Sequence, residues 1–215
     1  MRAAIFDFDG TLFDSMYVWE NFAKMFLSRV GAPEKPEAEE RVRYMCLIET
    51  AEYFISECGV SGTVEEVMAE CNRMLEEEYF YKVQTREGIP QLLSYLFEEN
   101  VPVYIATATE RYLVEAAIKR TGIDKYINGI LTCNDVGEGK TKPTVFLRAA
   151  ELMGSTPQET WVFEDALHAV TSASGAGFKV CAVYDSAESD HIDEIRSLSD
   201  IYVENFTQLD YGQLH

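Results

Sequence analysis

The sequence is short of positive charge and of long apolar stretches. Lysine and arginine together number 18 against 37 acidic residues, which leaves a formal net charge of −19. A charge of this sign and size repels nucleic acid and anionic lipid surfaces, so we expect neither as a partner. No apolar run approaches the roughly 18 residues that a membrane-spanning helix needs, so we expect no membrane segment either.

Cysteine is scarce as well, and its pattern argues against a disulfide scaffold. The five cysteines are odd in number, and no two of them are spaced as CxxC. We interpret them as reduced, mostly buried thiols. The first residues lack the basic-then-apolar pattern of a secretory signal, which also favours a cytoplasmic location.

Apolar residues are plentiful, at 47% of the chain, so the protein can bury a substantial core. Several short runs are continuously apolar, a pattern typical of strands that are covered on both faces of a parallel sheet. These runs are residues 3–6, 101–109, 129–132, 160–165 and 179–184. Helical patterns separate them, for example at 144–153 and 166–174. The alternation predicts a doubly wound α/β core.

One long segment interrupts the alternation. Over residues 16–82 the apolar residues recur at helical spacing, and Thr63 followed by Glu66 forms a capping-box pattern at a helix start. We therefore predict two domains. Residues 1–15 and 83–215 form the α/β core, and residues 16–82 form a helical insertion.

Polar residues gather at the ends of the predicted strands. In chain order they are Asp7 and Asp9, Thr107 and Thr109, Lys140 and Lys142, and Glu164 and Asp165. Ligands bind at the carboxyl ends of the strands in a doubly wound sheet, so the fold brings these groups together. Clustered carboxylates repel one another unless a cation lies among them, and their hard oxygens suit Mg²⁺. A divalent cation beside an ammonium and a hydroxyl is suited to holding a phosphoryl group.

Four of these segments carry recognisable motifs. In order they read DFDGT from residue 7, YIATAT from 104, GKTKPTVF from 139 and VFEDA from 162. With them, the sequence resembles the haloacid dehalogenase-like superfamily of phosphohydrolases. It is most similar to the subgroup with a helical cap, the β-phosphoglucomutase and phosphoglycolate phosphatase type. The resemblance covers nearly the whole chain and implies a Rossmann-like core with an inserted helical cap domain.

The resemblance also implies an activity, that of a Mg²⁺-dependent phosphatase acting as a monomer on a small-molecule phosphomonoester. Asp7 would be the nucleophile that forms an aspartyl-phosphate. Asp9 would protonate the leaving alcohol and then activate water. Thr107, Lys140 and a backbone N–H near Ala108 would hold the phosphoryl oxygens.

The same resemblance implies a set of metal ligands. Asp7, the backbone carbonyl of Asp9 and Asp165 would bind Mg²⁺ directly, and Glu164 would bind it directly or through water. The presence of Asp9 favours phosphoryl transfer over dehalogenation, because an alkoxide leaving group needs a proton.

The third motif departs from the family pattern, which leaves its lysine open. Counting back from Phe146 identifies Lys140, whereas aligning on the Lys-Pro pair identifies Lys142. We favour Lys140, because Pro143 and Phe146 then keep their family places. In the second motif, we predict that Thr109 caps the following helix and that Thr107 faces the site.

Three alternative functions are weighed against a phosphatase: a phosphosugar mutase, a phosphonate hydrolase and a binding protein. A phosphosugar mutase must hold a second phosphate, typically with a cap arginine; the segment CLIETAEYF lacks one, although Arg41 and Arg43 are near. A phosphonate hydrolase needs a cap lysine for a Schiff base, and Lys24, Lys35 and Lys82 are weak candidates. A catalytically silent binding protein is disfavoured by the intact acids and lysine. Which phosphorylated substrate is used stays open.

Overall fold

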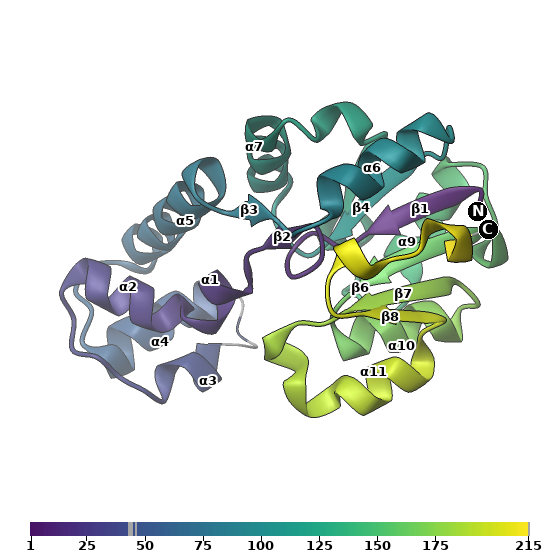
Figure 1. Ribbon diagram of the computed structural model, residues 1–215. Helices are drawn as coiled ribbons and strands as arrows, with labels where there is room; N and C mark the ends of the chain where they lie inside the picture. Colours follow the sequence, from purple (N-terminus) through teal and green to yellow (C-terminus); the bar gives the residue numbers. More distant parts are fainter. Residues whose placement is uncertain (43–44, 46, 215) are drawn as a thin grey trace. The chain divides into compact units, whose positions relative to one another are not determined.

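The structure of the protein, a computed structural model, describes residues 1–42, 45 and 47–214 (Figure 1). Arg43, one of the two arginines considered for a second phosphate, lies outside the described residues. Over the described part, no helix is both long enough and apolar enough to cross a membrane. The chain forms two compact units, an α/β unit of Met1–Asp14 and Val83–His215 and a helical unit of Ser15–Lys82.

The α/β unit is built on a six-stranded parallel sheet, whose strands lie side by side in Figure 1. The strands are β1 (Ala3–Phe6), β4 (Val103–Thr107), β5 (Gly129–Thr132), β6 (Thr160–Glu164), β7 (Lys179–Val183) and β8 (Ile201–Val203). Their order is β5-β4-β1-β6-β7-β8. The chain therefore builds outward from β1 in both directions, which confirms the predicted doubly wound sheet and puts a topological switch point beside β1.

Helices connect the parallel strands. They are α6 (Ile89–Glu98), α7 (Arg111–Thr121), α8 (Cys133–Val136), α9 (Thr144–Leu152), α10 (Leu167–Gly175) and α11 (Ile192–Leu198). Side chains of α9, α10 and α11 share one apolar core with the sheet, including Phe146, Val170 and Ile195, each at most 2% exposed. The connections through α6 and α7 lead from β1 to β4 and from β4 to β5, so they run along the sheet in the direction opposite to the connections through α9, α10 and α11. Because such crossovers are right-handed, α6 and α7 lie on the other face of the sheet. Both sheet faces are covered, which explains the continuously apolar strands.

Aromatic stacking joins the two central strands. The rings of Phe6 in β1 and Phe163 in β6 lie parallel with their centroids 4.1 Å apart. Phe6 pairs in register with Ile105 of β4 and with Phe163 of β6. The three strands therefore end at the same level, and the polar residues that follow them meet at one edge of the sheet.

The chain leaves and re-enters the α/β unit through two paired segments. The short strands β2 (Phe13–Asp14) and β3 (Gln84–Thr85) run antiparallel, and Phe13 pairs with Thr85.

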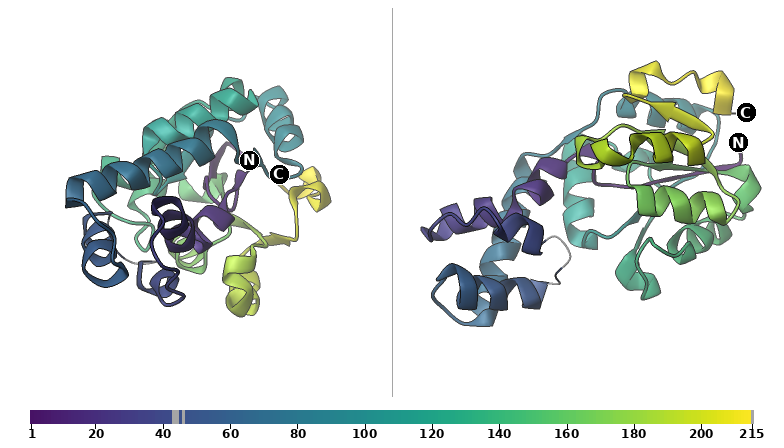
Figure 2. Two further views of the ribbon diagram at one scale, coloured as in Figure 1. Left: turned by 90° about the vertical axis from the view of Figure 1, so that its left-hand side faces the viewer. Right: turned by 90° about the horizontal axis from the view of Figure 1, so that it is seen from below.

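At the opposite edge of the sheet, the indole N–H of Trp161 donates to the carbonyl of Leu214 at 3.1 Å. The two marked chain ends accordingly lie side by side in both further views (Figure 2).

The helical unit contains α1 (Met16–Glu20), α2 (Phe22–Val30), α3 (Ala38–Val42), α4 (Leu47–Cys58) and α5 (Val64–Tyr81). The predicted capping box is confirmed, since Thr63 and Glu66 exchange hydrogen bonds at the start of α5. Phe26 of α2 stacks on Phe54 of α4 with ring centroids 4.6 Å apart, and both are fully buried. This aromatic pair forms the centre of a small apolar core.

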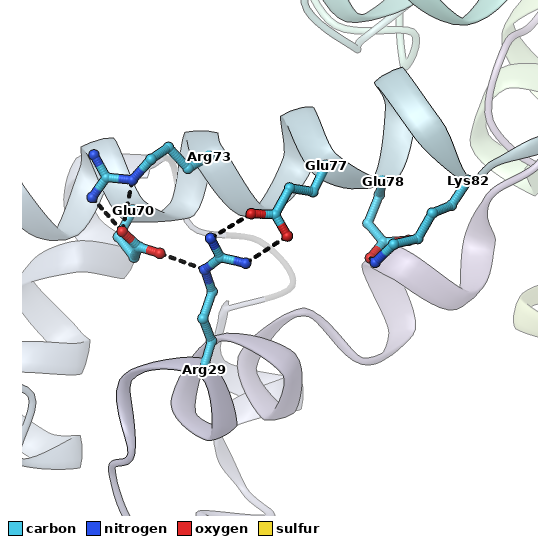
Figure 3. Close-up of polar contacts among 6 residues, drawn as sticks. All are labelled: Arg29, Glu70, Arg73, Glu77, Glu78 and Lys82. Atoms are coloured by element: carbon cyan, nitrogen blue, oxygen red, sulfur yellow. Dashed lines mark hydrogen bonds and ion pairs between the residues drawn. The ribbon is translucent and has the colours of Figure 1, made fainter.

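An ion network on the outside of this unit joins α2 to α5 (Figure 3). Arg29 donates to both carboxylate oxygens of Glu77, at 2.6 and 2.8 Å, and it also contacts Glu70. Glu70 in turn accepts from Arg73. We call Arg29, Glu70, Arg73 and Glu77 the exposed ion network, because their side chains are 22–59% exposed.

The described cysteines fit the predicted packing role. Cys58, Cys71 and Cys181 are buried, Cys133 is half-buried, and all four are free thiols. Burial raises the pKa of Cys71 to about 12 and also raises that of Cys181. These thiols stay protonated at neutral pH, as expected of side chains that only pack.

Candidate active site

Three carboxylates meet at the carboxyl edge of the sheet. Asp7 directly follows β1, Glu164 is the last residue of β6, and Asp165 follows it. One oxygen from each lies within 4.8 Å of the others, and all three side chains are buried. We call these residues the acidic triad. Their position next to the switch point of the sheet is where a doubly wound fold binds its ligand.

Lys140 lies against the acidic triad. Its ammonium contacts Asp7 and donates to Glu164 at 2.7 Å, and its side chain is 6% exposed. The ring of Phe146 lies beneath it, 5.8 Å from the ammonium. Lys142 instead pairs with Glu138 at 2.9 Å and is 65% exposed. Of the two lysines left open by the motif, the structure brings Lys140 to the carboxylates.

Burial makes the acidic triad electrostatically costly without a further cation. The pKa of Asp7 is raised to about 8: loss of solvent is the largest cause, Lys140 opposes the rise, and the charges of Glu164 and Asp9 add to it. Burial, followed by the charge of Glu164, likewise holds the pKa of Asp165 well above its usual value. Burial alone would lower the pKa of Lys140, but the adjacent acids outweigh it and raise that pKa.

The charge around Lys140 is therefore unbalanced. Within the described part of the chain, one ammonium, that of Lys140, lies against the three carboxylates of the triad. Hard, buried carboxylate oxygens are the donors that Mg²⁺ and similar cations prefer. The triad could thus hold a metal ion, whose charge would relieve the repulsion that raises the pKa of Asp7 and Asp165.

Glu164 is held from both sides. Its Oε1 accepts from Lys140, and its Oε2 accepts from the backbone N–H groups of Asp165 at 2.9 Å and Ala166 at 3.1 Å. Both oxygens thus already have protein donors. Glu164 anchors the turn that presents Asp165.

Asp9 and the second motif meet across the same edge. The hydroxyl of Thr109 donates to Asp9, and the backbone N–H of Thr109 donates to the hydroxyl oxygen of Thr107 at 2.9 Å. Ala108 lies exposed between them. The prediction that Thr109 caps α7 is wrong, because Glu110 occupies the N-cap position and Thr109 faces Asp9. A carboxylate accepts a stronger hydrogen bond than the hydroxyl could receive from a helix N–H.

The last two residues of the first motif, Gly10 and Thr11, lie against Asp165, a contact that the sequence analysis missed. The hydroxyl of Thr11 donates to Asp165 at 2.7 Å, and both groups are buried. Gly10 has a φ of +76°, and a Cβ at this position would lie 2.4 Å from an oxygen of Asp165. The turn after β1 therefore needs glycine both for its backbone conformation and for its close approach to that carboxylate.

Comparison with known proteins places most of the chain in one family. A sequence profile of the haloacid dehalogenase-like hydrolases matches residues 4–183. Hexitol phosphatase A of Escherichia coli (strain K12) is 30% identical over 201 residues, which are 90% of this chain and 88% of that protein. The bifunctional riboflavin kinase/FMN phosphatase of Arabidopsis thaliana is 26% identical over 208 residues. These are 94% of this chain but 55% of that protein, so the chain spans about half of its length.

The fold matches as well. The crystal structure of β-phosphoglucomutase from Clostridium difficile superposes with a TM-score of 0.72 at 18% sequence identity. The match covers 99% of this chain and 94% of that one. At this identity the likeness concerns the fold alone.

Proposed function

The chain belongs to the haloacid dehalogenase-like hydrolases, and from this premise we propose that it is a Mg²⁺-dependent phosphatase of small phosphomonoesters. The observation that carries the proposal is the buried acidic triad, two of whose carboxylates, Asp7 and Glu164, contact the ammonium of Lys140. The similarity to proteins named as phosphatases supports the same reaction type.

In this proposal Asp7 attacks the phosphorus of the substrate and becomes an aspartyl-phosphate, while the bond to the alcohol oxygen breaks. Asp9 gives its proton to that oxygen and then takes a proton from the water that attacks the aspartyl-phosphate. The hydrogen bond from Thr109 holds the carboxylate of Asp9 for both transfers. Lys140 and Thr107 stabilise the negative charge on the phosphoryl oxygens.

The donor set supports a hard divalent cation. Asp7, Asp165 and the backbone carbonyl of Asp9 would hold Mg²⁺. The two protein-bonded oxygens of Glu164 favour a contact through water for that residue. When bound, Mg²⁺ would neutralise charge on the phosphoryl group and keep Asp7 ionised for attack.

We further propose that the helical unit is the substrate-selecting cap domain. It is inserted between β2 and β3, directly after the segment that carries Asp7 and Asp9. A unit tethered by two adjacent connections can open and close about them, which excludes water from a phosphoryl-transfer site. The substrate class consistent with the whole arrangement is a small phosphorylated metabolite, with the chain acting as a monomer in the cytoplasm.

The test is a phosphate-release assay on p-nitrophenyl phosphate and on sugar, polyol and nucleoside phosphates, with Mg²⁺ and with EDTA. We expect Mg²⁺-dependent release and a loss of at least about 10³-fold in Asp7→Asn. Asp124→Asn, at an exposed acid of the same unit, is the matched control and should keep full activity.

Two outcomes would redirect the proposal. An absence of Mg²⁺-dependent release on every ester would contradict it and favour a silent binding protein. Interconversion of sugar phosphates without release of phosphate would identify a mutase of the same fold.

A further inference from the structure

Arg86 lies outside the recognised motifs, yet it contacts two loops at the carboxyl edge of the sheet. Its guanidinium donates to the carbonyl of Gly10, to the carbonyl of Tyr184 at 2.6 Å and to the carboxylate of Asp185 at 3.0 Å. Its own backbone N–H donates to Leu12 at 2.9 Å. The side chain is only 15% exposed, so these contacts are largely shielded from water.

Gly10 connects Arg86 to the acidic triad. Its carbonyl accepts from Arg86, and its N–H donates to Phe13 at 2.9 Å, so the peptide groups on both sides of Gly10 are held. The next residue, Thr11, donates its hydroxyl to Asp165. Gly10 itself lies directly against the Asp165 carboxylate. A displacement of Gly10 must therefore move the groups that orient Asp165.

The guanidinium of Arg86 also binds the loop after β7, which contains Tyr184 and Asp185. Asp185 is 7% exposed, and its two oxygens accept from Arg86 and from the backbone N–H of Ala187. This carboxylate follows β7, which pairs with the strand that ends at Glu164. Arg86 thus offsets the charge of a fourth buried acid at the same edge.

We propose that Arg86 is a positioning residue of the metal site, which sets the geometry of Asp165 and of the Asp9 carbonyl through the turn at Gly10. A planar guanidinium suits this role, because it spans three acceptors at fixed angles and a lysine ammonium does not. The inference rests on the proposed Mg²⁺ site.

The test measures Mg²⁺ binding without turnover. Isothermal titration calorimetry with Mg²⁺, supported by electron paramagnetic resonance with Mn²⁺, compares wild type with Arg86→Lys. We expect the dissociation constant to rise about tenfold in Arg86→Lys, with most of the phosphatase activity restored at high Mg²⁺. The KM for p-nitrophenyl phosphate at saturating Mg²⁺ should stay near the wild-type value.

Arg120→Lys is the matched control. Arg120 also donates to a backbone carbonyl on the segment that re-enters the α/β unit, that of Val83, but it does not contact Gly10 or Asp185. We expect this variant to bind Mg²⁺ like wild type. An equal loss of affinity in both arginine variants would show a general effect on folding and overturn the inference.

Thr11→Val tests the last step of the argument and serves in place of Arg86→Lys if that variant does not fold. It should weaken Mg²⁺ binding by a similar factor, and the double variant should lose less than the product of the two single effects. Wild-type affinity in a folded Arg86→Lys or Thr11→Val protein would overturn the inference while leaving the phosphatase proposal intact. A wild-type protein that binds Mg²⁺ but releases no phosphate would instead contradict the phosphatase proposal.

Discussion

The two units of this protein each contain a cluster of opposite charges, and the two clusters differ in burial and in the balance of positive and negative charge. In the exposed ion network, two arginines meet two glutamates on the solvent side of the helices. At the edge of the sheet, Lys140 is the one cationic side chain of the described residues that pairs with the buried acidic triad. The exposed ion network has equal numbers of positive and negative side chains and is in contact with solvent, whereas the cluster at the sheet edge has an excess of negative charge and is buried.

The difference separates charges that support a fold from charges that serve a site. Exposed pairs contribute little, because water and salt screen them and because long side chains lose entropy when they pair. Buried carboxylates cost stability unless a partner offsets them. An excess of buried acid is typical of sites that bind a cation or hold a reactive group, so the imbalance around Lys140 supports the proposed site at this edge of the sheet.

The largest contrast is expected from removing one cation from each cluster. In metal-free protein at pH 8, Lys140→Met should lower the free energy of unfolding by about 3–5 kcal/mol, because it leaves Asp7 and Glu164 facing each other in a dry site. Arg29→Met should cost no more than about 1 kcal/mol. Urea unfolding followed by circular dichroism measures both. Similar losses in the two variants would refute the distinction drawn between the clusters.

Removal of one acid should raise the free energy of unfolding in the buried cluster and lower it in the exposed ion network. Asp7→Asn should stabilise the metal-free protein at pH 8–9 by on the order of 1–2 kcal/mol, because it removes a charge that burial disfavours. Glu70→Gln should lower stability slightly, because Glu70 pairs with both Arg29 and Arg73. The same urea titrations in EDTA decide this, and a destabilised Asp7→Asn protein would contradict it.

The pH dependence should follow from the raised pKa of Asp7. The unfolded chain releases this proton near pH 4, whereas the metal-free folded protein holds it up to a pKa of about 8. The stabilisation from this group is therefore complete below about pH 4 and is lost as the pH rises towards about 8. Thermal melting in EDTA should show a smaller loss in Asp7→Asn than in wild type, because Asp165, whose pKa is also raised, still contributes in the variant. Added Mg²⁺ should raise the wild-type melting temperature most at pH 8–9.

The smallest expected effect is that of salt on the stability costs of these substitutions, and we expect it only in the exposed ion network. The small cost of Arg29→Gln at low ionic strength should shrink further in 1 M NaCl, where screening reaches within about 3 Å of a charge. The cost of Lys140→Met should change little, because its partners are buried. Urea midpoints at both salt concentrations provide the comparison, and equal salt sensitivity would count against it.

Sequence reasoning predicted the sheet and the edge where the acids meet, because continuous apolar runs that end in polar residues report burial and direction together. It could not predict β8 (Ile201–Val203), which is three residues long and partly exposed. It favoured Lys140 over Lys142 only by motif spacing, since two lysines two residues apart have equal reach. Their surroundings, Glu164 for one and Glu138 for the other, become visible only in three dimensions.

Contacts to backbone groups were the hardest to predict. Arg86 binds the carbonyls of Gly10 and Tyr184, which are 76 and 98 residues away in the chain, and a carbonyl has no sequence signature. Thr109 was expected at a helix cap because hydroxyl residues favour that position. The carboxylate of Asp9, brought near by the sheet, decided its conformation instead.

The pairing of β2 with β3 also has a consequence for how such a chain can diversify. Asp14 and Gln84 are partners across this two-strand ribbon, so the points of departure and return are neighbours. A two-residue hairpin turn could join them without disturbing the sheet. We therefore expect this junction to accept insertions of different size or composition in place of the helical unit, while the α/β unit keeps its geometry.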